Sequence, residues 1–241
     1  MLPRFVGRLG VADVVTIANA TLGFVATIVA FFDIELAARL ILVAAIADGV
    51  DGILARRYGG TPVGPYLDSL ADVSSFAIAP AVLAFVFVTD GMGISFETIS
   101  ISLLAVLGIC ALFVAMAVTR LGLYTTYDTA DHYTVGIQTT LAATFVGAAI
   151  LAGVSNPLLI LGVTAAFCYL MVSPILYPDL LVRDALIMGV IHVLAILIPT
   201  FAGRTFPYAL LTLTIAYMTL SPWFYWRDES PPTDLDVYGN A

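Results

Sequence analysis

Long apolar runs recur along the whole chain and restrict its fold more than any other feature. Eight hydrophobic segments are separated by short polar or Gly- and Pro-rich stretches, near residues 12–32, 36–57, 66–89, 98–122, 135–153, 157–177, 184–202 and 206–225. A helix needs about 20 apolar residues to cross the ~30 Å hydrocarbon core of a bilayer. With 61% hydrophobic residues and a mean hydropathy of +1.04, the sequence predicts an all-α, polytopic membrane protein with about eight transmembrane helices.

The distribution of arginines predicts how these helices are oriented. Arg39 and Arg204 fall at the outer ends of the predicted spans if the N-terminus is cytoplasmic. The other seven arginines then lie on or near the cytoplasmic side: Arg4, Arg8, Arg56, Arg57, Arg120, Arg183 and Arg227. Because cytoplasmic loops are enriched in positive residues, we expect both termini in the cytoplasm and the protein in the cell membrane.

The charged residues also bear on partners and on the end of the chain. Nine arginines and no lysine stand against seventeen acids, for a net charge of −8, so nucleic-acid binding is not expected. An acidic chain without lysine is typical of a high-salt cytoplasm and predicts a halophilic source. Residues 1–226 are expected to form one integral membrane domain, and residues 227–241, with two prolines and four acids, a disordered acidic tail.

Four aspartates interrupt the apolar pattern within 25 residues. Asp48 and Asp51 lie three apart in one segment, and Asp68 and Asp72 lie four apart in the next. Both spacings place the pair on one face of a helix, and the Gly- and Pro-rich residues 59–65 predict a turn that brings the two pairs together. Carboxylates at membrane depth are costly without compensation. Clustered carboxylate oxygens suit hard divalent cations such as Mg²⁺ or Mn²⁺, so the sequence predicts a metal site.

This stretch resembles the signature of the CDP-alcohol phosphatidyltransferases. It reads D-x-x-D-G-x-x-A-R, then seven residues, then G-x-x-x-D-x-x-x-D. The fixed positions are filled by Asp48, Asp51, Gly52, Ala55, Arg56, Gly64, Asp68 and Asp72. The resemblance implies a six-helix catalytic core, here with two further helices, in which an alcohol displaces CMP from a CDP-activated lipid. It also implies a homodimer.

The resemblance assigns roles to the aspartates. Asp48, Asp51 and Asp68 are expected to hold two divalent ions, with Asp72 shared between the ions and the attacking hydroxyl. Asp72 is the expected general base, since the last aspartate of the signature has that role in the family.

Small residues and one arginine of the signature are expected to contact the nucleotide. Gly52 and Ala55 would let a flat cytidine approach the backbone, although close helix packing is an alternative reason for each. Arg56 suits a bidentate contact to phosphate, although an anchor at the membrane edge is an alternative role for it. Gly64 would free the turn that brings Asp68 over Asp48. Asn19, in a T-x-x-N pattern similar to the family's, is expected to contact nucleotide or metal-bound water, or else to form an interhelical hydrogen bond.

The acceptor alcohol is indicated by residues 67–83, LDSLADVSSFAIAPAVL, which resemble the phosphatidylserine synthase branch, with Ala77 in place of a glycine. Further on, Arg120 and Gly136 match that branch, while a second arginine, an asparagine and two prolines are missing. With these departures, the chain resembles an archaeal variant of the branch, similar to the archaetidylserine synthases, which would use a CDP-activated ether lipid. We therefore expect L-serine as acceptor, with its carboxylate on Arg120, and CDP-archaeol or CDP-diacylglycerol as donor.

Two alternatives remain open from the sequence. Glycerol phosphate or an inositol phosphate could be the acceptor, but each would require more cationic side chains than the chain offers. Carboxylates within spans also line the pathways of cation transporters. An arginine beside the site argues against cation transport, because it would oppose cation binding.

Overall fold

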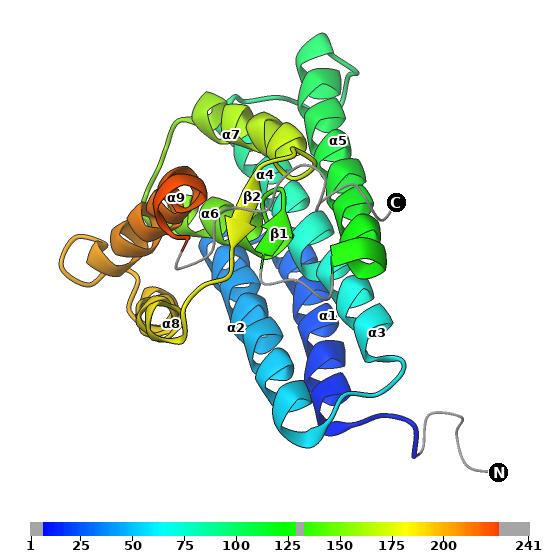
Figure 1. Ribbon diagram of the computed structural model, residues 1–241. Helices are drawn as coiled ribbons and strands as arrows, with labels where there is room; N and C mark the ends of the chain where they lie inside the picture. The colour runs from blue at the N-terminus through cyan, green and yellow to red at the C-terminus, as the bar shows by residue number, and fades with distance from the viewer. Residues whose placement is uncertain (1–6, 129–132, 227–241) are drawn as a thin grey trace.

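The structure, a computed structural model, describes residues 7–128 and 133–226 and is built mainly from helices (Figure 1). Its elements in chain order are α1 (Val11–Val29), α2 (Ile34–Tyr58), α3 (Gly64–Asp72), the π-helical segment η1 (Val73–Ile78), α4 (Ala79–Gly91), α5 (Ile101–Leu123), the π-helical segment η2 (Tyr124–Asp128), β1 (Tyr133–Val135), α6 (Thr139–Leu151), α7 (Pro157–Leu170), β2 (Leu176–Pro178), α8 (Val182–Leu197) and α9 (Thr205–Phe224). The acidic tail expected at 227–241 lies outside the described residues.

Each of the eight predicted hydrophobic segments contains a helix. The segment near 66–89 corresponds to α3, η1 and α4, which follow one another without a break. Within the described ranges, three helices are long and apolar enough to cross a membrane: Val11–Val29, Gly64–Gly91 and Ile101–Tyr127. Helices α6 and α7 have only 13 and 14 residues, about 20 Å at 1.5 Å per residue, which is less than the bilayer core. The chain is a helical integral membrane protein, and the number of full spans stays a prediction.

Local sequence explains where α2 and α3 begin and end. Asp33 caps α2, and its carboxylate accepts the Leu36 N–H at 2.9 Å, as is usual for an N-cap aspartate. The helix ends at Gly59, whose φ of +88° is readily adopted by glycine. Helix α3 then starts at Gly64–Pro65, with proline in its first turn. The return of the chain places the second aspartate pair beside the first.

Helix α1 packs against both α2 and the α3–η1 segment (Figure 1). Close approach to η1 depends on Gly23, because a Cβ there would lie 2.5–2.6 Å from Ser75 atoms. The Ser75 hydroxyl also donates to the Asn19 carbonyl oxygen at 2.8 Å. These contacts fix α1 against the segment that follows Asp72.

Two three-residue strands form an antiparallel pair that the sequence did not predict. Tyr133 pairs with Pro178 and Val135 with Leu176. The chain leaves β1 through Gly136 at φ +74°, where a Cβ would lie only 2.3 Å from the Met171 carbonyl oxygen. The pairing brings the chain on either side of α6 and α7 together near the carboxylates.

The opposite end of α2 carries an ion network. Arg204 Nη2 lies 2.9 Å from Glu35 Oε1, and Arg39 Nη2 lies 3.9 Å from Glu35 Oε2. Arg204 also donates to the Leu151 carbonyl oxygen at 2.7 Å. The two arginines predicted at the outer ends of the spans therefore meet at one carboxylate.

Candidate active site

Three of the four predicted aspartates form a carboxylate cluster. Asp48 comes from α2, and Asp68 and Asp72 come from α3. One carboxylate oxygen of each lies within 4.8 Å of the others. Asp72 is only 8% exposed, and its buried Oδ1 has no hydrogen-bond partner among the residues that the structure describes. Converging carboxylates with an unsatisfied buried oxygen fit a divalent metal ion, and these three residues could hold one.

Asp51 lies beside this cluster but is oriented differently. Its Oδ2 accepts a hydrogen bond from the Thr16 hydroxyl at 2.5 Å. The side chain is buried, with 5% exposure, and it lines a neighbouring cavity rather than completing the group of three. Its expected role as a metal ligand stays a prediction.

The larger of two cavities at the cluster has a volume of about 430 Å³, and we name it the Arg56 cavity. It is lined by Ala12, Asp13, Thr16, Asp51, Gly52, Ala55, Arg56, Gly60, Thr61, Gly64, Pro65, Asp68, Ser69, Tyr124 and Thr125. The side chain of Arg56 lies over Gly52, where an added Cβ would be 3.4 Å from Nη1 of the guanidinium. The structure therefore brings the four predicted nucleotide residues of the signature to one cavity.

The smaller cavity has a volume of about 200 Å³, and we name it the Arg120 cavity. It is lined by Asp48, Asp68, Ser69, Asp72, Arg120, Leu121, Tyr124, Tyr133, Thr134, Gln138, Thr139, Thr140 and Asp179. Asp68, Ser69 and Tyr124 line both cavities. Of the carboxylate cluster, Asp68 thus borders both cavities, whereas Asp48 and Asp72 line only the Arg120 cavity.

Arg120 is buried and oriented in the smaller cavity. It is 6% exposed, and its Nη2 donates to the Thr134 hydroxyl of β1 at 2.8 Å. Its guanidinium carbon lies 5.4 Å from the centre of the Tyr124 ring, a cation–π distance. Among the described residues that line this cavity, Arg120 is the single basic side chain.

Asn19 does not line either cavity. It is fully buried, and both polar atoms of its side-chain amide lack a hydrogen-bond partner in the described part of the chain. The interhelical bond at this position runs instead from Ser75 to the Asn19 backbone.

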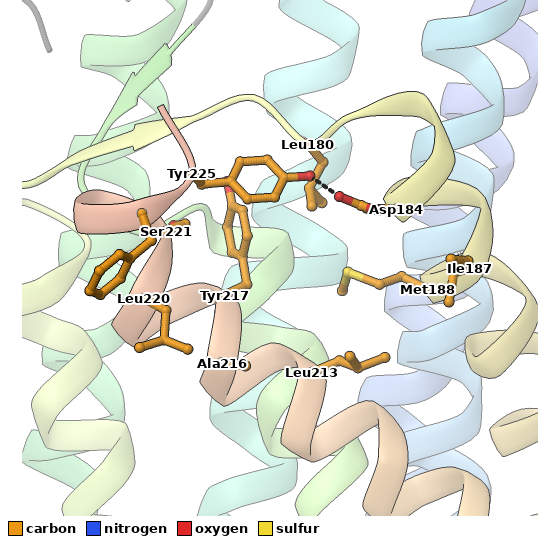
Figure 2. Close-up of a pocket in the computed structure, with 11 residues that line it drawn as sticks. Leu180, Asp184, Ile187, Met188, Leu213, Ala216, Tyr217, Leu220, Ser221 and Tyr225 are labelled. Atoms are coloured by element: carbon orange, nitrogen blue, oxygen red, sulfur yellow. Dashed lines mark hydrogen bonds between the residues drawn. The ribbon is translucent and has the colours of Figure 1, made fainter. Parts of the chain in front are cut away.

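A third cavity, of about 330 Å³, lies between α8 and α9 (Figure 2). Its lining is mostly aliphatic, and a hydrogen bond joins Tyr225 to Asp184. Next to it, the Tyr217 hydroxyl donates to the Pro178 carbonyl oxygen at 2.7 Å, and the Tyr225 hydroxyl accepts the Leu181 N–H at 3.1 Å. The two tyrosines hold the chain on both sides of Asp179, which lines the Arg120 cavity.

Sequence reasoning missed several residues of this site. Thr134 and Asp179 reach the Arg120 cavity only through the strand pair, and no local pattern marks them. Asp13 had a detectable signal, since it is an acid in an apolar run and lies three residues before Thr16, on the same helix face.

The sequence model of the family described as CDP-alcohol phosphatidyltransferase matches residues 9–173, more than half of the chain. The chain belongs to this family. It is therefore a transferase of phospholipid biosynthesis, and the match runs from the start of α1 to the end of α7.

Three curated relatives are similar over different lengths. The archaetidylserine synthase of Methanothermobacter thermautotrophicus is 26% identical over 174 residues, which cover 70% of each chain. CDP-diacylglycerol–serine O-phosphatidyltransferases from two strains of Helicobacter pylori are 33% and 31% identical, over 48% and 61% of this chain. The aligned parts span 46% and 62% of those two relatives.

Proposed function

We propose that the protein transfers the phosphatidyl or archaetidyl group of a CDP-activated lipid to the hydroxyl of L-serine and releases CMP. One observation carries the proposal: the cluster of Asp48, Asp68 and Asp72 lines the Arg120 cavity and, through Asp68, also borders the Arg56 cavity, which has a different lining. Serine-specific names among the relatives support the same acceptor.

The nucleotide of the donor occupies the Arg56 cavity. Arg56 binds a phosphate oxygen, and Gly52 and Ala55 leave room for the nucleoside. A divalent ion held by Asp48, Asp68 and Asp72 would neutralise the diphosphate and stabilise the leaving CMP phosphate. Two ions, with Asp51 as a further ligand, and Mg²⁺ or Mn²⁺ as the metal, belong to the proposal.

Serine occupies the Arg120 cavity. Its carboxylate binds Arg120, and its hydroxyl faces Asp72, which accepts the hydroxyl proton. The serine oxygen then bonds to the phosphorus that carries the lipid, and the bond from that phosphorus to the bridging oxygen of CMP breaks. Burial of both side chains keeps them fixed relative to each other, which favours the reactive geometry.

A single arginine in the Arg120 cavity favours serine over glycerol phosphate or an inositol phosphate. A phosphate monoester carries up to two negative charges, whereas the serine carboxylate carries one. Membership of the transferase family argues against cation transport as the function.

The proposal places the site at the cytoplasmic face of the cell membrane. Glu35 and Arg56 are 21 residues apart on α2, about 32 Å along the axis, close to the thickness of a bilayer core. The Glu35 network would lie at the outer face and the two cavities at the cytoplasmic face. We further propose about eight spans, both termini in the cytoplasm, and a homodimer.

An acceptor screen tests the proposal. Purified protein in detergent is given CDP-archaeol or CDP-diacylglycerol with serine, glycerol phosphate or inositol phosphate, and CMP release is measured with Mg²⁺, with Mn²⁺ and with chelator. We expect release with serine and a divalent ion, and almost none for Asp72→Asn with CMP binding retained. Faster release with glycerol phosphate would overturn the acceptor, and near-normal turnover by Asp72→Asn would remove it as the base.

A further inference from the structure

Asp13 is a buried carboxylate in the Arg56 cavity that the reaction described above does not use. It lies in the first turn of α1 and is only 2% exposed. Its Oδ2 accepts the Gly10 N–H at 2.7 Å and the Thr61 hydroxyl at 2.8 Å. Two donors on one oxygen fix the direction of the whole carboxylate.

The other oxygen, Oδ1, faces the cavity wall formed by the start of α3. A Cβ added at Gly64 would lie 3.4 Å from Oδ1, so glycine at this position keeps the space beside that oxygen open. Among residues 7–128 and 133–226, the Asp13 side chain accepts two hydrogen bonds, and both end on Oδ2. A buried, oriented acceptor therefore borders space in which a ligand can lie.

Asp13 lies outside the carboxylate cluster. Thr16, which bonds Asp51, lies one turn deeper, about 4.5 Å along the helix axis. Both Asp13 and Arg56 line the cavity. With the diphosphate between the carboxylate cluster and the Arg56 guanidinium, the base of the nucleotide would lie beside Asp13. A carboxylate there repels phosphate but accepts hydrogen bonds from a neutral base.

Among the pyrimidines, cytosine presents the matching donor. Its N4 amino group donates, and carboxylates accept from it in known recognition of cytosine. Uracil has a carbonyl oxygen at the same position, which a carboxylate would repel. We propose that Asp13 Oδ1 accepts a hydrogen bond from the N4 amino group of the cytosine base and selects CDP-lipids over UDP-lipids. This inference rests on the placement of the nucleotide in the proposed function.

Equilibrium binding of free nucleotides to the full-length protein tests this assignment without any acceptor. Affinities for CMP, UMP and zebularine monophosphate, which lacks the N4 amino group, are measured by calorimetry with Mg²⁺ present. We expect the wild-type protein to prefer CMP by at least about tenfold, the loss expected for one hydrogen bond to a charged acceptor.

Asp13→Asn is the specificity variant. The Asn amide oxygen can still accept the bonds from Gly10 and Thr61, while its NH₂ group donates to the uracil carbonyl. The ratio of CMP to UMP affinity should fall at least about tenfold. Thr61→Val is the matched control, because it removes one bond that orients Asp13 but leaves the carboxylate. It should lower the CMP to UMP ratio less than Asp13→Asn does.

The binding measurements can contradict the assignment of Asp13 in two ways. Equal wild-type affinity for CMP and zebularine monophosphate overturns the assignment even if no variant folds. An unchanged CMP to UMP ratio in Asp13→Asn also overturns it and leaves Asp13 as a structural clamp. Failure of the wild-type protein to bind CMP would overturn the nucleotide site itself, whereas a different acceptor in the screen would leave base selection by Asp13 intact.

Discussion

Replacing Arg120 should separate binding of the acceptor from binding of the donor. Its guanidinium is buried, held by Thr134 at 2.8 Å and packed on Tyr124, in the cavity assigned to serine. Loss of a hydrogen bond to a charged group costs about 1.5–3 kcal/mol. At 1.4 kcal/mol per tenfold change, Arg120→Ala should raise the KM for serine about 12-fold to 140-fold. The KM for the CDP-lipid should stay within about twofold.

Two further variants make this prediction specific. Arg120→Lys keeps the charge but loses the planar arrangement of donors, so its rise in the serine KM should be smaller than that of Arg120→Ala. Thr134→Val removes the hydroxyl that orients the guanidinium and should raise the serine KM with little effect on CMP binding. All are measured by initial rates of CMP release at varied serine and varied CDP-lipid. A serine KM within threefold of wild type in Arg120→Ala, or an equal rise in both KM values, would refute the assignment.

Four other predictions follow from the geometry and composition. Gly52→Ala places a methyl group in the Arg56 cavity and should raise the KM for the CDP-lipid about tenfold. Gly49→Ala is the control, because a Cβ there meets open space. Its KM for the CDP-lipid should equal that of the wild type in the same rate assay. Gly23→Ala would bring a Cβ within 2.5–2.6 Å of Ser75 in η1, and this overpacking should lower the free energy of unfolding by about 1–3 kcal/mol. The effect is measured as a lower Tm in detergent. A Tm equal to that of Gly108→Ala, a position that faces open space, would contradict the packing of α1 against η1. Asp48→Asn should weaken Mn²⁺ binding, followed by electron paramagnetic resonance, at least about tenfold, and unchanged affinity would exclude Asp48 as a ligand. The net charge of −8 without lysine predicts that activity falls in dilute buffer, and activity equal to that in molar salt would count against a halophilic source.

The carboxylate cluster could be predicted because its geometry is local. Two helices joined by a short turn bring an i,i+3 pair and an i,i+4 pair together. Helix geometry also explains why Asp51 lies outside the cluster of three carboxylates. Three residues rotate a helix by about 300°, so Asp51 is turned about 60° from Asp48 and shifted about 4.5 Å along the axis. That displacement takes it to Thr16 and the Arg56 cavity.

The rest of the site depends on contacts between distant parts of the chain. Arg120 meets Thr134 from another element, and Tyr133 pairs with Pro178 far along the chain. Strands of three residues leave no alternating pattern in the sequence, so neither β1 nor the position of Asp179 could be predicted. Such pairings are set by tertiary packing, and sequence periodicity carries no information about them.

The strand pair has a consequence for how the choice of alcohol can change. The family match ends at residue 173, yet the wall of the Arg120 cavity includes Asp179. The chain on both sides of Asp179 is held by Tyr217 of α9 and by Tyr225, the residue after α9. In the function proposed above, the residues of the nucleotide cavity all lie within the matched residues 9–173, whereas Asp179 of the acceptor cavity lies beyond them, between β2 and α8. We therefore expect that exchanging the residues after 173 for those of another family member changes the preferred alcohol and leaves the aspartate signature untouched.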